Sequence, residues 1–241
     1  MMTIEIVTRD LMSEEGAILS QPTPVAQPRP IDRQRVRITF ARGANARYVG
    51  HLDLARTWER ILRRARLPLA YSEGFNPRPR LTFAAALPVG CTSDHEVLDV
   101  VLSPPCDPAD VRARLDRAVP AGLQVLDVVD VPYSEPALPM QTRAAEFVVS
   151  VETEESLEQV QARVRALLDA PSLERTRRDK SYDLRPLILD LWVESGAGGR
   201  ASVGMRLRAD ESGTGRPDEV AAALGWDPVA VHMHRRKLIF G

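Results

Sequence analysis

The order in which hydrophobic patterns change along this chain restricts its fold more than any other feature. Residues 35–41 alternate apolar and polar side chains, as in a half-buried strand. Residues 51–67 place apolar side chains three or four positions apart, as in an amphipathic helix. Two strand patterns, a helix with proline in its first turn and a fourth strand pattern follow, at residues 80–85, 96–103, 107–119 and 122–131. This β-α-β-β-α-β order is typical of a ferredoxin-like unit.

A second series of the same kind follows a proline-rich break. It contains a strand, a helix, three strands, a helix and a final strand, at residues 144–152, 156–170, 173–178, 183–194, 200–209, 216–225 and 229–240. We therefore predict an α+β fold of two ferredoxin-like halves in a pseudo-duplicated arrangement, with domains at residues 35–132 and 144–241. Residues 1–34 are rich in proline and poor in groups to bury, which predicts a disordered N-terminal extension.

Positive charge is concentrated in one part of a chain whose net charge is only -1. Between Arg33 and Arg80 there are twelve arginines and three acidic residues, an excess of nine positive charges. Such a segment suits phosphates or acidic partners, although a solvated arginine-rich face would have the same composition. Only 5% of the residues are aromatic, so few side chains are available to stack on bases.

The loop between the first helix and the next strand combines a restricted backbone with polar side chains. It reads YSEGFNPRPRL, in which Gly74 permits a tight turn and Pro77 and Pro79 restrict the backbone. The loop could hold Asn76 and Arg78 in fixed positions beside the arginine-rich helix, or it could be a structural turn whose polar groups bind the local backbone. The candidate binding residues are His51, Asp53, Arg56, Arg60, Glu73, Asn76, Arg78, Arg80, Asp183 and Arg185.

The length of the first helix limits how these residues can meet. A helix from Leu52 to Arg66 spans about 22 Å at roughly 1.5 Å per residue, so His51 at its start and Glu73 beyond its end should lie apart. We therefore expect an elongated basic groove, with Asn76 near one end and His51 near the other. A groove of this kind suits a polymer such as RNA.

Other polar residues give weaker indications of a binding site. Asp183 and Arg185 lie two positions apart in an expected strand, so they could form an ion pair or bind a ligand between the halves. Two further groups are suggestive of metal, Cys91 with Asp94 and His95, and His232 with His234. Neither group supplies four ligands, so no metal site is predicted.

A resemblance to a known family is carried by residues 37–90, which read RITFARGANARYVGHLDLARTWERILRRARLPLAYSEGFNPRPRLTFAAALPVG. They resemble the bacterial radical-SAM-linked protein family, a domain of unknown function found alone or joined behind a radical SAM domain. HLDL and GFNPRPRL are the specific blocks, and KSYDLRPLI and GRPDEVAAALG extend the resemblance. The resemblance implies a radical SAM enzyme as a partner and a link to RNA metabolism, with no assigned activity or catalytic residue.

The chain itself lacks the thiols for radical SAM chemistry. A cluster of that type needs three closely spaced thiolates, and the chain has two cysteines, Cys91 and Cys106. We therefore expect no cofactor, and an accessory protein that binds RNA or presents a substrate to a partner enzyme. The alternatives are an enzyme with a polar site around His51, Asp53 and Glu73, and a scaffold that docks a radical SAM protein without RNA. With no signal-peptide pattern and no long apolar run, we expect a cytoplasmic protein with no membrane association.

Overall fold

The structure is a computed structural model that describes residues 32–177, 179–197 and 199–241, which form one unit from Asp32 onward. The α-helices are α1 (His51–Arg64), α2 (Pro108–Asp116), α3 (Leu138–Gln141), α4 (Leu157–Asp169) and α5 (Pro217–Ala223). None of these helices, within the described ranges, has the length and apolar character needed to cross a membrane. Two 3-10 helices are η1 (Ala44–Ala46) and η2 (Arg185–Leu187). The strands are β1 (Gln34–Arg42), β2 (Leu81–Phe83), β3 (Cys91–Leu102), β4 (Leu123–Val131), β5 (Thr142–Glu152), β6 (Glu174–Arg177), β7 (Lys180–Asp183), β8 (Ile188–Ala197), β9 (Arg200–Asp210), β10 (Gly213–Thr214) and β11 (His232–Phe240).

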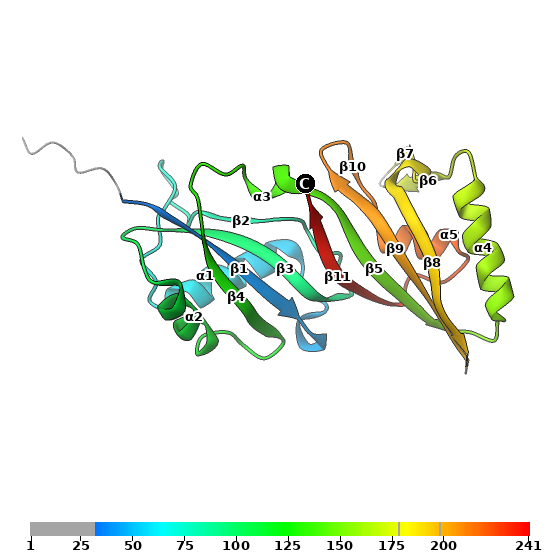
Figure 1. Cartoon of the computed structure of the whole chain (residues 1–241), viewed down its shortest axis with the longest axis horizontal. Coiled ribbons are helices and arrows are strands. Elements are labelled where there is room, and N and C mark those ends of the chain that lie inside the picture. Colours follow the sequence, from blue (N-terminus) through cyan, green and yellow to red (C-terminus); the bar gives the residue numbers. More distant parts are fainter. Residues whose placement is uncertain (1–31, 178, 198) are drawn as a thin grey trace, which may run out of the picture. The chain divides into compact units, whose positions relative to one another are not determined.

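The last strand of the chain has a central position in the main sheet (Figure 1). This 9-stranded sheet has the order β10-β9-β5-β11-β3-β1-β4, with β2 pairing to β3 and β8 pairing to β9. β11 runs antiparallel to β5 and parallel to β3, so it joins the two series of elements into one sheet. β6 and β7 form a separate two-stranded sheet.

One hydrophobic core lies between the first series of strands and the helices α1 and α2. Val36, Ile38 and Phe40 are fully buried, as the alternation in β1 predicts. The apolar stripe of α1 packs against them, and the rings of Phe40 and Trp58 lie 4.8 Å apart, edge to face. Burying one large apolar side chain stabilises the fold by roughly 1.5–3 kcal/mol. The inner face of α1 therefore fixes the helix, and its outer face has no part in the core.

A second core lies between β5, β8, β9 and β11 and the helices α4 and α5. α4 begins with a capping box between Ser156 and Gln159, and its buried residues include Val160 and Val164. Leu87, from the segment between β2 and β3, also packs into this core. The second core therefore includes a segment from the first series of elements.

The prediction of a chain that combines helices and strands is confirmed, because the structure has a large mixed sheet and, within the described residues, five α-helices. Two ferredoxin-like halves are not confirmed, because β11 pairs with a strand from each series. The domain boundaries at residues 132 and 144 stay a prediction. Of the predicted extension, Gln34 begins β1, Asp32 and Arg33 precede it, and residues 1–31 lie outside the described residues.

The prediction of one continuous strand over residues 183–194 is wrong. β7 ends at Asp183, η2 follows, and β8 begins at Ile188. Pro186 lies in η2 and has no backbone N–H to donate to a strand ladder. Asp183 and Arg185 therefore do not share the face of one strand.

Candidate nucleic-acid interface

The outer face of α1 carries exposed arginines with weak ionic partners. Arg56 Nη1 lies 3.0 Å from Asp53 Oδ1, and Arg63 Nη2 lies 3.2 Å from Glu59 Oε2. Arg60 is exposed and forms no ion pair with any described residue. Exposed pairs of this kind contribute about 0–1 kcal/mol. A phosphate could therefore replace these carboxylates at low energetic cost.

The clearest gathering of positive charge lies between the end of α1 and α2. A cavity of about 280 Å³ is lined there by Arg64, Arg66, Arg114 and Arg117, which we name the arginine groove. Within the part of the chain that the structure describes, only Arg114 has a carboxylate partner, with its Nη2 at 2.6 Å from Asp110 Oδ2. Arg114 and Arg117 are not among the predicted site residues, because they lie beyond the arginine-rich segment. Their spacing of three positions in an expected helix was the available signal.

Arg66 has a backbone conformation that glycine adopts more easily. Its φ is 54°, in the left-handed region. The residue follows the C-terminal end of α1, where its N–H donates to the carbonyl of Arg63 and the N–H of Leu67 donates to that of Leu62. Arg114 Nη1 donates to the carbonyl of Arg66 at 3.3 Å. This conformation costs an L-residue about 1–2 kcal/mol, a cost that glycine avoids.

The loop after α1 is a closed hairpin. Tyr71 and Pro79 form a β-bridge, the N–H of Ser72 donates to the carbonyl of Arg78 at 2.8 Å, and the N–H of Arg78 donates to Ser72 Oγ at 3.0 Å. Phe75 at the tip is fully exposed, at 111% of its reference area. A phenyl ring held in water by a fixed backbone is available to stack on a base or on a partner.

The hairpin arginines do not join the arginines of α1. Arg78 and Arg80 line a cavity of about 400 Å³ together with Arg35 and Asp99, which belong to the sheet face opposite α1. The described lining of this cavity contains no residue of α1. Glu73 Oε1 lies 3.9 Å from Arg80 Nη2. The continuous groove from Asn76 to His51 therefore stays a prediction, and Asn76 itself is exposed on the hairpin.

Asp183 and Arg185 bind the backbone of the second series of elements. Asp183 Oδ1 accepts the N–H of Leu173 at 2.8 Å and that of Arg185 at 2.9 Å, and these bonds hold the pKa of Asp183 below its usual value. Arg185 Nη2 donates to the carbonyl of Leu168 at 2.7 Å, and its Nη1 donates to that of Ile188 at 2.9 Å. Both side chains fix the path between α4 and β8.

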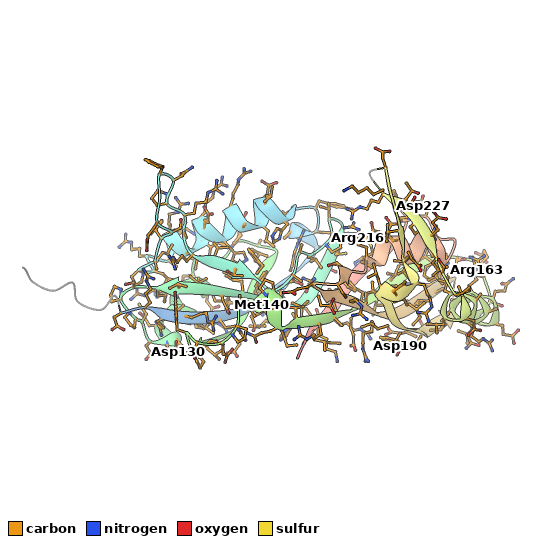
Figure 2. The ribbon with its side chains drawn as sticks, turned by 90° about the horizontal axis from the view of Figure 1, so that it is seen from above. Asp130, Met140, Arg163, Asp190, Arg216 and Asp227 are labelled. Carbon is orange, nitrogen blue, oxygen red and sulfur yellow. The ribbon has the colours of Figure 1, made fainter. Side chains whose placement is uncertain are left out.

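His51 lines a separate cavity of about 510 Å³ together with Arg177, Arg216 and Arg235. Figure 2 shows Arg216 on the same side of the sheet as α1, the light-blue helix. Asp53 and Glu73 are absent from the described lining of this cavity. The three residues of the predicted enzyme site, His51, Asp53 and Glu73, are therefore not gathered around it.

The metal-ligand candidates have other partners. The described residues hold no group of three or more histidines, cysteines, aspartates and glutamates that could bind a metal ion. His234 Nδ1 lies 2.8 Å from Thr92 Oγ1, and its Nε2 lies 2.9 Å from Asp94 Oδ2. Burial raises the pKa of the Cys91 thiol to about 12, which disfavours the thiolate that a metal requires.

Fold and surface together define a mixed α/β protein with a basic face on its helices. Residues 35–217 match the model of a family described as an uncharacterized protein conserved in bacteria (DUF2344), and the chain belongs to this family. No curated protein matches the chain.

Several solved structures align with the chain at low similarity. One is an H/ACA RNP bound to a substrate RNA containing 2′-deoxyuridine, at 11% identity over 84% of this chain and 46% of that chain, with a TM-score of 0.40. Another is a Cbf5-Nop10-Gar1 complex, at 10% identity over 84% of this chain and 47% of that chain, with a TM-score of 0.43. The chain thus spans about half the length of the solved chains that it matches.

Proposed function

We propose that this protein is an RNA-binding accessory protein and that its arginine groove binds the phosphate backbone. The observation that supports this proposal is that four arginines at the C-terminal ends of α1 and α2 line one cavity, with one carboxylate partner among the described residues. The planar guanidinium fork donates paired hydrogen bonds to phosphate oxygens. Backbone contacts of this kind position RNA without reading its sequence.

The spacing of the α1 arginines favours a polymer over a single small anion. Arg56 and Arg64 are eight positions apart, about 12 Å along the helix. A nucleic-acid strand carries one phosphate per roughly 3.4 Å in a duplex, so this surface can meet several consecutive phosphates. Phe75 adds an exposed ring to the hairpin at the far end of α1, which supports binding of single-stranded RNA by stacking.

The test is the affinity for a single-stranded RNA measured by fluorescence anisotropy over a range of salt concentrations. The double variant Arg64→Gln/Arg117→Gln should bind more weakly, and the slope of log affinity against log salt should fall by about 0.7 for each phosphate that the variant no longer neutralises. Arg165→Gln is the matched control, because Arg165 is an exposed arginine on α4, away from the groove. A parent protein without RNA affinity, or an unchanged slope in the double variant, would refute the proposal.

Two further variants separate the groove from the hairpin. Arg66→Gly removes a groove charge at a backbone position that glycine accepts, so RNA affinity should fall while the melting temperature is retained. Arg78→Glu/Arg80→Glu tests the hairpin. If only the hairpin pair weakens RNA binding, the interface lies on the cavity around Arg78 and the groove assignment is wrong.

We infer two ferredoxin-like halves, supported by the strand orders β4-β1-β3-β2 and β11-β5-β9-β8, which follow the same sequence of elements. Native-state hydrogen exchange tests it, because two halves should exchange as two cooperative units. A single cooperative unit across residues 35–241 would argue against the division.

Partnership with a radical SAM enzyme rests on the family resemblance alone. A pull-down from a bacterial lysate, with and without nuclease, separates it from RNA binding. Partners that disappear after nuclease treatment support RNA. A radical SAM enzyme retained after nuclease treatment, together with no affinity for RNA, would support the scaffold in its place.

A further inference from the structure

We propose that the cavity around His51 is a binding site for a phosphate monoester with an apolar body. We name it the anion cavity, and its lining includes the basic residues His51, Arg177 and Arg216 and the apolar residues Leu87 and Phe147. Its volume of about 510 Å³ lies in the range of small-molecule sites. The proposal does not depend on RNA binding by the arginine groove.

The lining of the anion cavity contains basic residues from three separate elements. His51 begins α1, Arg177 ends β6, and Arg216 precedes α5. No aspartate or glutamate belongs to the lining that the structure describes. Arg177 forms no ion pair with a described residue, so its charge is uncompensated there. The cavity therefore attracts anions.

Arg216 has an unused donor. Its Nη2 lies 2.8 Å from Asp218 Oδ2, and its Nε is buried without a hydrogen-bond partner among the described residues. A buried guanidinium N–H without a partner is unfavourable, and a bound anion would supply one. Asp218 compensates part of the charge of Arg216, and it lies outside the lining of the cavity.

Arg235 positions part of the cavity lining, and the anion binds to the other basic residues. It donates to both carboxylate oxygens of Glu96, to the carbonyl of Ala86 at 3.1 Å and to that of Ala85 at 3.3 Å. These bonds use its charge and most of its donors. They hold Ala85 and Ala86, which belong to the apolar part of the lining together with Leu87, Pro88 and Val89.

The number and spread of the donors favour phosphate over carboxylate. One guanidinium fork saturates a carboxylate, whereas the three terminal oxygens of a phosphate monoester accept from several donors at different angles. The wall of alanine, leucine, proline, valine and phenylalanine side chains would remove an apolar ester group from water. A phosphate monoester with an aromatic or aliphatic body therefore matches both the basic and the apolar residues of the lining.

The test uses phenyl phosphate, inorganic phosphate and benzoate as probes, with binding to the full chain measured by isothermal titration calorimetry. Phenyl phosphate should bind about tenfold or more tightly than either of the others, because only it can use both the basic and the apolar residues of the lining. Arg177→Ala and Arg216→Ala should each weaken it about tenfold, and Arg165→Ala on α4 should not. Absence of phenyl phosphate binding at millimolar concentration, or unchanged binding in both cavity variants, would overturn the proposal.

A variant that keeps every charge distinguishes loss of the binding site from unfolding of the protein. Ala86→Trp should fill the cavity and abolish phenyl phosphate binding while the melting temperature stays near that of the parent. Two hexanucleotides, with a 5′-phosphate or a 5′-hydroxyl, then identify the source of the phosphate. Displacement of phenyl phosphate only by the phosphorylated one assigns the site to an RNA end, and displacement by neither assigns it to a free small molecule. Equal binding of phenyl phosphate by Ala86→Trp and the parent would place the ligand elsewhere and refute the site.

Discussion

Replacing Arg235 with methionine should destabilise the protein strongly. Arg235 and Glu96 form a buried ion pair, with side-chain exposures of 1% and 3%. Its Nε donates to Glu96 Oε1 at 2.7 Å, and its guanidinium lies 5.8 Å from the ring centre of Phe147. Methionine keeps much of the apolar volume and leaves the Glu96 carboxylate buried without its partner.

The magnitude follows from that isolated carboxylate. Removing one partner of a buried pair costs about 3–5 kcal/mol. The carbonyls of Ala85 and Ala86 add little, because these residues are accessible enough for water to replace the broken hydrogen bonds. We therefore expect the free energy of unfolding to fall by about 3–5 kcal/mol in urea titrations followed by tryptophan fluorescence.

The neighbouring residue provides the control. Arg236 also forms a pair, with Glu194, and its side chain is 46% exposed, so Arg236→Met should cost about 1 kcal/mol or less. The double variant Glu96→Gln/Arg235→Met removes the unpaired carboxylate of Glu96. It should recover part of the free energy of unfolding that Arg235→Met loses. Equal costs for Arg235→Met and Arg236→Met, or a double variant less stable than Arg235→Met alone, would refute this reasoning.

Three further predictions follow from single sites. Because the pKa of Cys91 is raised to about 12, a thiol reagent should label Cys106 in the native protein and Cys91 only after unfolding, as read by mass spectrometry. Desolvation lowers the pKa of His232 from 6.5, so the unfolded chain binds more protons and stability should fall as the pH drops through 6.5; His232→Gln should reduce this loss in denaturation curves. Gly204→Ala would place a Cβ 2.1 Å from Trp192 Cε2, so it should cost about 1–3 kcal/mol in urea unfolding and alter the near-UV spectrum of the tryptophan.

The elements with a clear hydrophobic period could be predicted from the sequence. In β1 the alternation of Val36, Ile38 and Phe40 with arginines indicated the buried face, and in α1 the stripe through Trp58 and Ile61 indicated the inner face. These patterns are local, because each reflects one face of one element against the core. The same patterns predict that the arginines of β1 and α1 lie on the opposite, outer faces.

Pairing between distant elements could not be predicted in this way. The strand pattern of β11 fits an edge or a central strand equally, and nothing in it indicates parallel pairing with Cys91 to Ser93 of β3. The anion cavity depends on that pairing, because Arg235 of β11 holds Ala85 and Ala86. The arginine groove likewise depends on the packing of α1 against α2. The number of arginines along the chain does not predict this packing.

The two proposed sites lie at opposite ends of α1, and we therefore predict that they bind their ligands independently. His51 at its first position lines the anion cavity, and Arg64 at its last position lines the arginine groove. The 14-residue helix separates them by about 20 Å at roughly 1.5 Å per residue. Sites more than about 10 Å apart without shared partners behave independently. Arg64→Gln should therefore weaken RNA binding without changing phenyl phosphate binding, and Arg177→Ala should do the reverse for an RNA with a 5′-hydroxyl. A dinucleotide is too short to reach both ends even when it is fully extended. Mutual effects measured with such a short RNA by anisotropy and calorimetry would show that the two sites are one surface.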